Sequence, residues 1–149
     1  MEKIQPKRNK PEKLIGLIFA SLFIFISNIA FAEIAVIVHP ENSSSLDKKA
    51  IKKIFMGKTK KFANGNVILP MNASKGAPSR DNFNELAIGR TTAQVNAYWS
   101  KLVFTGKGTM PRELTSDAEI IATVSANKGA ISYVDASAVT DAVKVIATY

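Results

Sequence analysis

The chain has 149 residues, a formal net charge of +8, no cysteine and a single histidine. This composition lacks the cysteine and histidine sets that hold zinc, copper or iron–sulfur centres, so we expect no metal and no cofactor. The length allows one domain with one hydrophobic core, and the basic balance suits an anionic ligand or surface.

Residues 1–32 have the pattern of a secretory signal peptide. A basic stretch precedes an apolar run from Leu14 to Ile26, and the segment ends in an A-x-A pattern at Ala32. These three features are typical of cleavable export signals. We predict cleavage after Ala32 and a periplasmic domain over residues 33–149. The alternative is an inner-membrane anchor, because residues 14–32 are long enough to span a bilayer.

The predicted domain begins with a β-branched run from Ile34 to Val38, which stops before His39-Pro40. Such a run indicates a strand that is covered on both faces, as in a parallel or mixed sheet. Apolar residues then recur at helical spacing between Leu46 and Phe55, and Gly57 stands where a helix commonly ends. The domain therefore starts with a strand and a helix.

The middle of the chain predicts a turn, a strand and a helix. Asn64-Gly65-Asn66 is a turn signal, and Val67 to Met71 is the next strand, with Pro70 near a sheet edge or exit. Ser79 is the expected N-cap of a helix that ends at Gly89. The expected inward positions of this helix are Phe83, Leu86 and Ala87.

Thr91 or Thr92 is expected to cap the next helix, whose apolar residues follow the i, i+3, i+4, i+7, i+8 stripe. These residues are Val95, Tyr98, Trp99, Leu102 and Val103. We interpret residues 104–111 as a helix end and a loop. Their glycines and lysine do not stand in the order of a nucleotide-binding P-loop, and they follow a helix instead of a strand.

Thr115 or Ser116 begins a further predicted helix, with acidic residues in its first turn and an end at residues 127–129. Residues 130–134 and 143–147 are the last two predicted strands. The order β-α-β-α-α-α-β-β predicts an α/β fold in which helices flank a small mixed sheet.

The loop of residues 72–79 is the candidate ligand site. Open α/β sheets bind ligands beyond the carboxyl ends of their strands, and the first N–H groups of a helix lack partners and favour anions. Arg80 adds a planar set of donors for an oxyanion. The alternative is that Arg80 pairs with Asp81 or Glu85 on a solvated helix face. The candidate oxyanion-binding residues are Gly76, Ala77, Ser79 and Arg80.

Basic residues gather on the polar face of the first predicted helix and just after it. The four on the helix are Lys48, Lys49, Lys52 and Lys53, and Lys58, Lys60 and Lys61 follow. A solvated helix face explains this pattern, and docking on an acidic partner or an anionic membrane surface is the functional alternative. We expect no nucleic acid partner, because aromatic residues do not interleave with the lysines.

An enzyme is not expected. Residues 33–149 contain no G-x-S-x-G pattern, no evident acid–base pair and no metal-binding set. His39 follows a strand that is predicted to be buried, and we interpret it as a structural or rim residue.

Several segments, taken in order, resemble the phosphate-binding branch of the type 2 periplasmic solute-binding proteins of ABC transporters. They are Ile54-Phe55-Met56-Gly57-Lys58, Val67 to Asn72 leading to Gly76 to Phe83, Ala97 to Ser100 with Phe104 to Gly108, and Gly129 to Val134. The resemblance implies the type 2 periplasmic binding protein fold. The family encloses its ligand between two lobes, and residues 33–149 have the length of one, so we expect a single lobe.

The same resemblance implies phosphate or a similar oxyanion as ligand, but the loop departs from the family pattern. Ala73 stands at the family's arginine position, Ala77 and Pro78 replace its serine and glycine, and Ser79 replaces its threonine. Two hypotheses follow. The first is weak oxyanion binding, with a homodimer or a membrane protein closing the open side. The second is an accessory or interaction module of an envelope complex, which has a degenerate pocket and docks through the lysines of its first helix.

Overall fold

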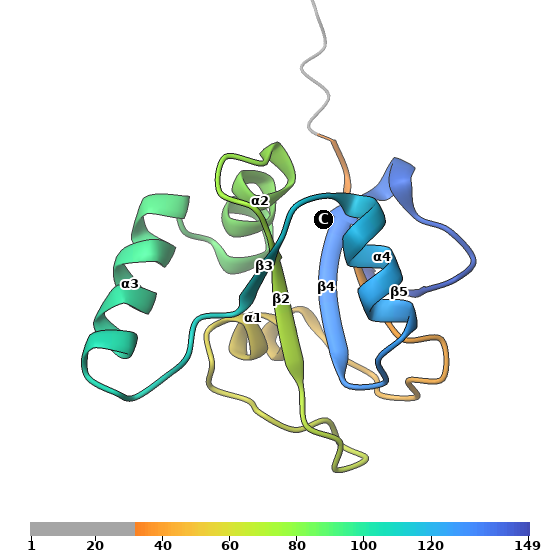
Figure 1. Cartoon of the computed structure of the whole chain (residues 1–149), viewed down its shortest axis with the longest axis horizontal. Coiled ribbons are helices and arrows are strands. Elements are labelled where there is room, and N and C mark those ends of the chain that lie inside the picture. Colours follow the sequence, from red (N-terminus) through yellow and green to blue (C-terminus); the bar gives the residue numbers. More distant parts are fainter. Residues whose placement is uncertain (1–31) are drawn as a thin grey trace, which may run out of the picture. The chain divides into compact units, whose positions relative to one another are not determined.

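The computed structural model describes residues 32–149 (Figure 1). The predicted signal peptide, residues 1–32, lies outside the described residues except for its last position, and so does nearly all of the alternative anchor. Within the described part, no helix combines the length and the apolar character needed to cross a membrane.

A five-stranded mixed sheet forms the centre of the domain, in the order β3-β2-β4-β1-β5. Strand β2 runs parallel to both β3 and β4, whereas β1 is antiparallel to both β4 and β5. The strands are β1 Ile34–Val38, β2 Leu69–Ala73, β3 Arg112–Leu114, β4 Ala130–Asp135 and β5 Lys144–Thr148. The predicted α/β class with a small mixed sheet is confirmed.

Helices pack on both faces of this sheet, with α4 in front of it and α1 behind it in Figure 1. All five residues of β1 are buried, which explains its continuous β-branched run. The helices are α1 Lys48–Phe55, α2 Pro78–Phe83, α3 Thr92–Phe104 and α4 Asp117–Ser125. A π-helical segment, η1 Asn84–Ile88, continues α2, and a short 3-10 turn, η2 Ala136–Ala138, follows β4.

An aromatic cluster joins α1, α2 and β4. The rings of Phe83 and Tyr133 stack with centroids 3.9 Å apart, and Phe55 meets Phe83 edge to face at 4.7 Å. Such pairs add about 0.5–1.5 kcal/mol beyond the burial of their area. The cluster therefore fixes α2, and with it the candidate loop, against the sheet.

Side chains cap three of the helices at the places where local signals are strongest. Asp47 caps α1, Ser116 caps α4, and Thr91 forms a capping box with Gln94 at the start of α3. Each cap gives a partner to an N–H group that the helix itself cannot satisfy. Of the two residues predicted as alternatives at each start, Thr91 and Ser116 are the caps, instead of Thr92 and Thr115.

The predicted start of α2 is wrong. Ala77 is the N-cap, and Pro78 occupies the first helical position, where its fixed φ and missing N–H carry little cost. Ser79 is therefore inside the helix instead of capping it. The π-helical segment also shifts the helix phase, which leaves Leu86 47% exposed while Ile88 is buried.

Two predictions about the strands need correction. The strand expected over Val67 to Met71 lies at Leu69–Ala73. Pro70 pairs with β4 on one side, and on its other side the pairing of β2 with β3 begins only at Met71. The three-residue strand β3 was not expected, because so short a segment has no periodicity. Val103 of α3 is 49% exposed instead of buried.

Candidate functional site

The candidate loop lies beyond the carboxyl end of β2, between that strand and α2. Gly76 has a φ of 82°, a left-handed conformation that glycine adopts without strain. A backbone bond of 3.2 Å from Ala77 N to Ser74 O closes the turn. Gly76 is exposed, whereas Ala77 and Ser79 are half-buried. The loop is thus where the sequence predicts it, with Gly76 and Ala77 in its turn and Ser79 in the first turn of α2.

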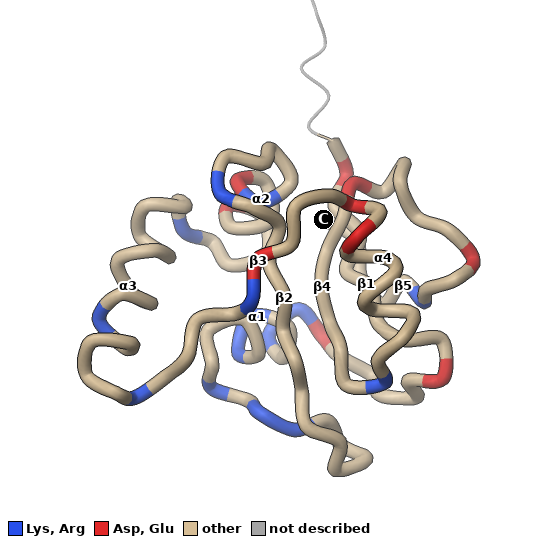
Figure 2. Tube along the Cα trace, viewed as in Figure 1, with Lys and Arg blue, Asp and Glu red and all other residues tan. Residues whose placement is uncertain are grey.

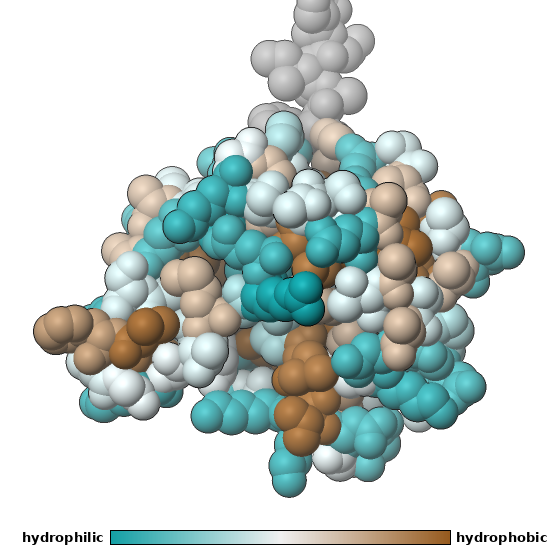
Figure 3. Space-filling view, viewed as in Figure 1, coloured by the Kyte–Doolittle hydropathy of each residue, from teal (hydrophilic) through white to brown (hydrophobic). Residues whose placement is uncertain are grey.

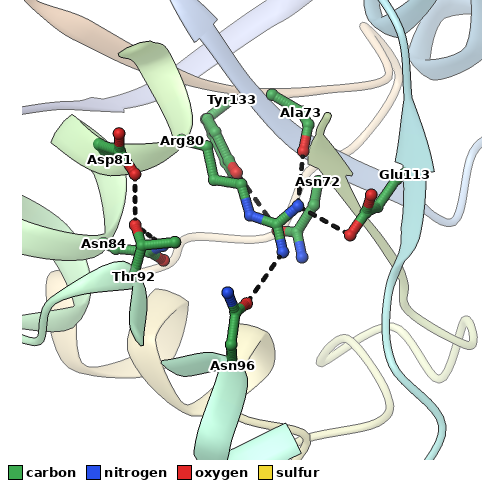
Figure 4. Close-up of polar contacts among 9 residues, drawn as sticks. All are labelled: Asn72, Ala73, Arg80, Asp81, Asn84, Thr92, Asn96, Glu113 and Tyr133. Atoms are coloured by element: carbon green, nitrogen blue, oxygen red, sulfur yellow. Dashed lines mark hydrogen bonds and ion pairs between the residues drawn. The ribbon is translucent and has the colours of Figure 1, made fainter. Parts of the chain in front are cut away.

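The Arg80 side chain points into the protein, toward Ala73 at the end of β2 and Glu113 of β3 (Figure 4). Its side chain is 2% exposed, and its Nη1 donates to Glu113 Oε1 at 2.8 Å and to Ala73 O at 3.1 Å. Its Nη2 donates to Asn96 Oδ1 at 3.3 Å. Both hydrogens of Nη1 are therefore in use. The expected pairing with Asp81 or Glu85 on a solvated face is wrong.

Three elements far apart in the sequence supply the acceptors of Arg80. Ala73 ends β2, Asn96 lies in α3, and Glu113 lies in β3 directly beside Asn72 in the parallel register. The guanidinium thus connects the sheet edge to α3. No local pattern could have indicated Asn96 or Glu113. Glu113 belongs to a strand that the sequence did not predict, and Asn96 belongs to a helix that starts after the loop.

Hydrogen bonds around Arg80 hold the neighbouring side chains in place. Tyr133 donates its hydroxyl to Asn72 Oδ1 at 3.3 Å. Burial raises the pKa of the Tyr133 phenol, and the nearby Arg80 charge opposes this shift only in part. Thr92 links α3 to α2 by donating to Asp81 and accepting from Asn84 Nδ2 at 2.9 Å. The polar side chains around Arg80 therefore hydrogen-bond to one another or to the backbone.

Acidic residues lie near this end of the sheet. Figure 2 shows Asp and Glu positions along the backbone at β3 and at the upper end of α4. Burial raises the pKa of Asp117, the charge of Asp135 acts in the same direction, and a backbone hydrogen bond at Asp135 opposes both. Hydrogen bonds from Thr115 lower the pKa of Glu119. Negative charge at this end of the sheet disfavours an anion there, although water and salt screen the exposed carboxylates.

The lysines of α1 form a second candidate region, and all four are exposed. The Lys48 amino group lies 4.6 Å from the centre of the Tyr149 ring. Lys48 does not line the hollow that the other three lysines share. Lys49, Lys52 and Lys53 line a surface hollow of about 220 Å³. Met56, Lys58 and Arg90 complete its lining.

The lining of this hollow carries basic residues and no acidic residue. Its charged lining comes from α1, from the turn after α1 and from the turn before α3. Within residues 32–149, the salt bridges join Arg80 to Glu113 and Lys128 to Glu41, and neither involves the hollow. The sequence indicated the lysines, but only the fold shows that Arg90 joins them.

Comparison with known proteins places this fold in a known class. A family model described as the PBP superfamily domain matches residues 23–148, and the chain belongs to this family. No match was found among curated proteins.

Solved structures that resemble the chain include proteins of phosphate transport. An ABC-type phosphate transport receptor from Vibrio cholerae has a TM-score of 0.61 and 16% identity, over 78% of this chain and 46% of that one. A protein assigned as a phosphate ABC transporter substrate-binding protein from Clostridium perfringens, solved with bound phosphate, has a TM-score of 0.61 and 23% identity, over 78% and 45%. PstS from Borrelia burgdorferi has a TM-score of 0.55 and 16% identity, over 77% and 47%.

The chain thus spans about half the length of the solved structures that it matches. The resemblance to the phosphate-binding branch and the single-lobe fold are confirmed at the level of family and fold. The first of these proteins is named as a transport receptor and the second as a substrate-binding protein.

Proposed function

We propose that the chain is an exported interaction module. It keeps the fold of a solute-binding lobe but no longer binds a solute with the affinity of a transport receptor. The observation that carries this proposal is the Arg80 environment. The guanidinium is buried, and Glu113, Ala73 and Asn96 accept its hydrogen bonds. A ligand anion would have to displace the Glu113 carboxylate, which is held at 2.8 Å.

The composition of the loop supports the same proposal. Ala73 and Ala77 offer no side-chain donor, and Pro78 has no N–H group. Hydrogen bonds to a charged group contribute about 1.5–3 kcal/mol each, so their loss weakens anion binding steeply. With one lobe, a bound anion would also stay in contact with water, where its interactions are weak.

The docking face in this proposal is the polar side of α1, with Lys48, Lys49, Lys52 and Lys53. The supporting observation is that three of these lysines line a hollow whose lining includes no acidic residue. We propose that the module works in the periplasm after cleavage at Ala32, on a component of the cell envelope. Mass spectrometry of the exported protein tests the cleavage, and a first residue other than Glu33 contradicts it.

Titration calorimetry of the exported protein with phosphate and with sulfate, at low salt, tests the loss of receptor function. We expect no saturable heat up to millimolar anion. Micromolar binding that Arg80→Ala abolishes would contradict the proposal. Recovery of envelope partners by the wild-type protein and by a variant with all four lysines reversed tests the docking face, and unchanged recovery removes it.

A second candidate function is weak capture of phosphate or a similar oxyanion at Gly76, Ala77, Ser79 and Arg80. It is supported by the position of the loop beyond β2 and by the fold shared with a protein solved with bound phosphate. A homodimer or a membrane protein would cover the open side. Millimolar phosphate binding that depends on Arg80 is the result expected from this candidate.

A further inference from the structure

The C-terminal end of α3 carries an unusually exposed aromatic side chain. Phe104 is 93% exposed, and Val103 beside it is 49% exposed. Figure 3 shows an apolar patch over the lower part of α3, at the left of the view. Burial of a phenylalanine side chain is strongly favourable, so this tip has the chemistry of a contact surface. Lys101 and Lys107 flank it in the sequence.

Phe104 lies on the same face of α3 as a second surface hollow. Gln94, Ala97, Lys101 and Phe104 recur at i, i+3, i+7 and i+10, which places them on one helix stripe. The first three line a broad hollow of about 660 Å³ together with Gly89, Arg90 and Tyr98. The aromatic tip is therefore at the end of this surface.

Arg90 connects this surface to the lysines of α1, because it lines both hollows. Tyr98 fixes the two helices together by donating its hydroxyl to Met56 O at 2.8 Å. The described residues that line the two hollows include no carboxylate. The resulting cationic surface consists of Lys49, Lys52, Lys53, Lys58, Arg90 and Lys101.

We propose that this cationic surface and Phe104 dock together on an anionic phospholipid bilayer. The proposal rests on the proposed interaction function and names its partner. Headgroup phosphates complement the lysines and Arg90, and the aromatic tip enters the boundary between headgroups and acyl chains. Charge complementarity and a protruding apolar tip on one surface favour a membrane over an acidic protein, whose charges alone would leave Phe104 in water.

Each cation near an anionic membrane strengthens binding about fivefold, so two reversed lysines lower affinity by at least about 25-fold. Loss of the aromatic ring lowers it by about tenfold. Binding also weakens with salt, because exposed charges are screened.

Vesicle co-sedimentation of the exported protein tests the proposal. The vesicles are phosphatidylglycerol with phosphatidylcholine, compared with phosphatidylcholine alone. We expect binding to the anionic vesicles only, with the stated losses in Lys52→Glu/Lys53→Glu and in Phe104→Ser. The matched controls are Lys75→Glu/Lys128→Glu, which has the same net charge, and Val67→Ser, which removes an exposed apolar side chain elsewhere. Both controls should bind as the wild type does.

Equal binding to neutral vesicles, no binding, or equal loss in the controls would overturn the membrane proposal. Recovery of an acidic protein through the same lysines, without vesicle binding, would overturn it and leave the interaction function intact. Tight, Arg80-dependent phosphate binding would instead overturn the interaction function, whatever the vesicles show.

Discussion

Two basic regions of the molecule differ in what their charges contact. Arg80 is 2% exposed, and Glu113, Ala73 and Asn96 accept its hydrogen bonds. The lysines of α1 are exposed, and none of them joins a salt bridge in the described part of the chain. The hydrogen bonds of the arginine are made inside the fold, whereas the lysines are exposed to solvent. A basic residue at a ligand position is thus no evidence for a ligand until its own partners are known.

The largest effect is expected from removing the partner of the buried cation. Glu113→Ala leaves the Arg80 guanidinium buried without its carboxylate, which should destabilise the domain by about 2–4 kcal/mol, since Glu113 itself is partly exposed. Denaturant unfolding measures the change. The matched control is Glu41→Ala, which breaks the exposed pair with Lys128 and should cost less than about 1 kcal/mol. Equal losses would show that the Arg80 pair is also superficial.

A smaller effect is expected where α1 meets α3. Gly57 has a φ of 69°, and a Cβ there would lie 2.8 Å from the Trp99 ring. Gly57→Ala should therefore cost about 2–3 kcal/mol through backbone strain and the contact with this buried ring. The control is Gly65→Ala, at a φ of 86° in open space, which keeps only the strain. Thermal unfolding compares the two, and equal shifts would exclude a tight contact at Trp99.

A still smaller effect on stability is expected on the basic face. Lys52→Glu/Lys53→Glu changes exposed side chains in the last turn of α1 that form no salt bridge in the described residues, so the free energy of unfolding should fall by about 1 kcal/mol or less, through the helix macrodipole. Denaturant unfolding checks this, beside the large loss expected in vesicle binding. A loss above about 2 kcal/mol would mean that these lysines support the fold.

The smallest effect concerns pH. Hydrogen bonds from the Thr115 backbone and hydroxyl lower the pKa of Glu119 from its ordinary value of 4.5. A lowered folded-state pKa contributes stability that is present above pH 4.5 and is lost as the pH falls through the lowered value. Glu119→Gln should therefore flatten the acid limb of a stability–pH profile. An unchanged acid limb would show that these bonds do not select the carboxylate.

Local signals predicted most of the fold. β-Branched runs located β1 and most of β4, and Thr91 and Ser116 marked two helix starts, because capping and periodicity act over a few residues. Strand β3 and the phase shift at η1 were missed, because pairing with β2 and packing against α1 decide them.

The candidate site was less predictable than the fold. The loop residues Gly76 to Arg80 were found from their place after a strand, but the direction of the Arg80 side chain depends on Glu113 in β3 and Asn96 in α3. The proposed docking surface was likewise predictable only in part. The α1 lysines follow helical spacing, whereas Arg90 joins them only through the packing of α3 on α1.

A crystal of the exported protein soaked in concentrated phosphate tests the central claim most directly. The account predicts that Glu113 Oε1 stays about 2.8 Å from Arg80 Nη1 and that no phosphate contacts the guanidinium. Phosphate bound to Arg80, with the Glu113 carboxylate turned away, would contradict it.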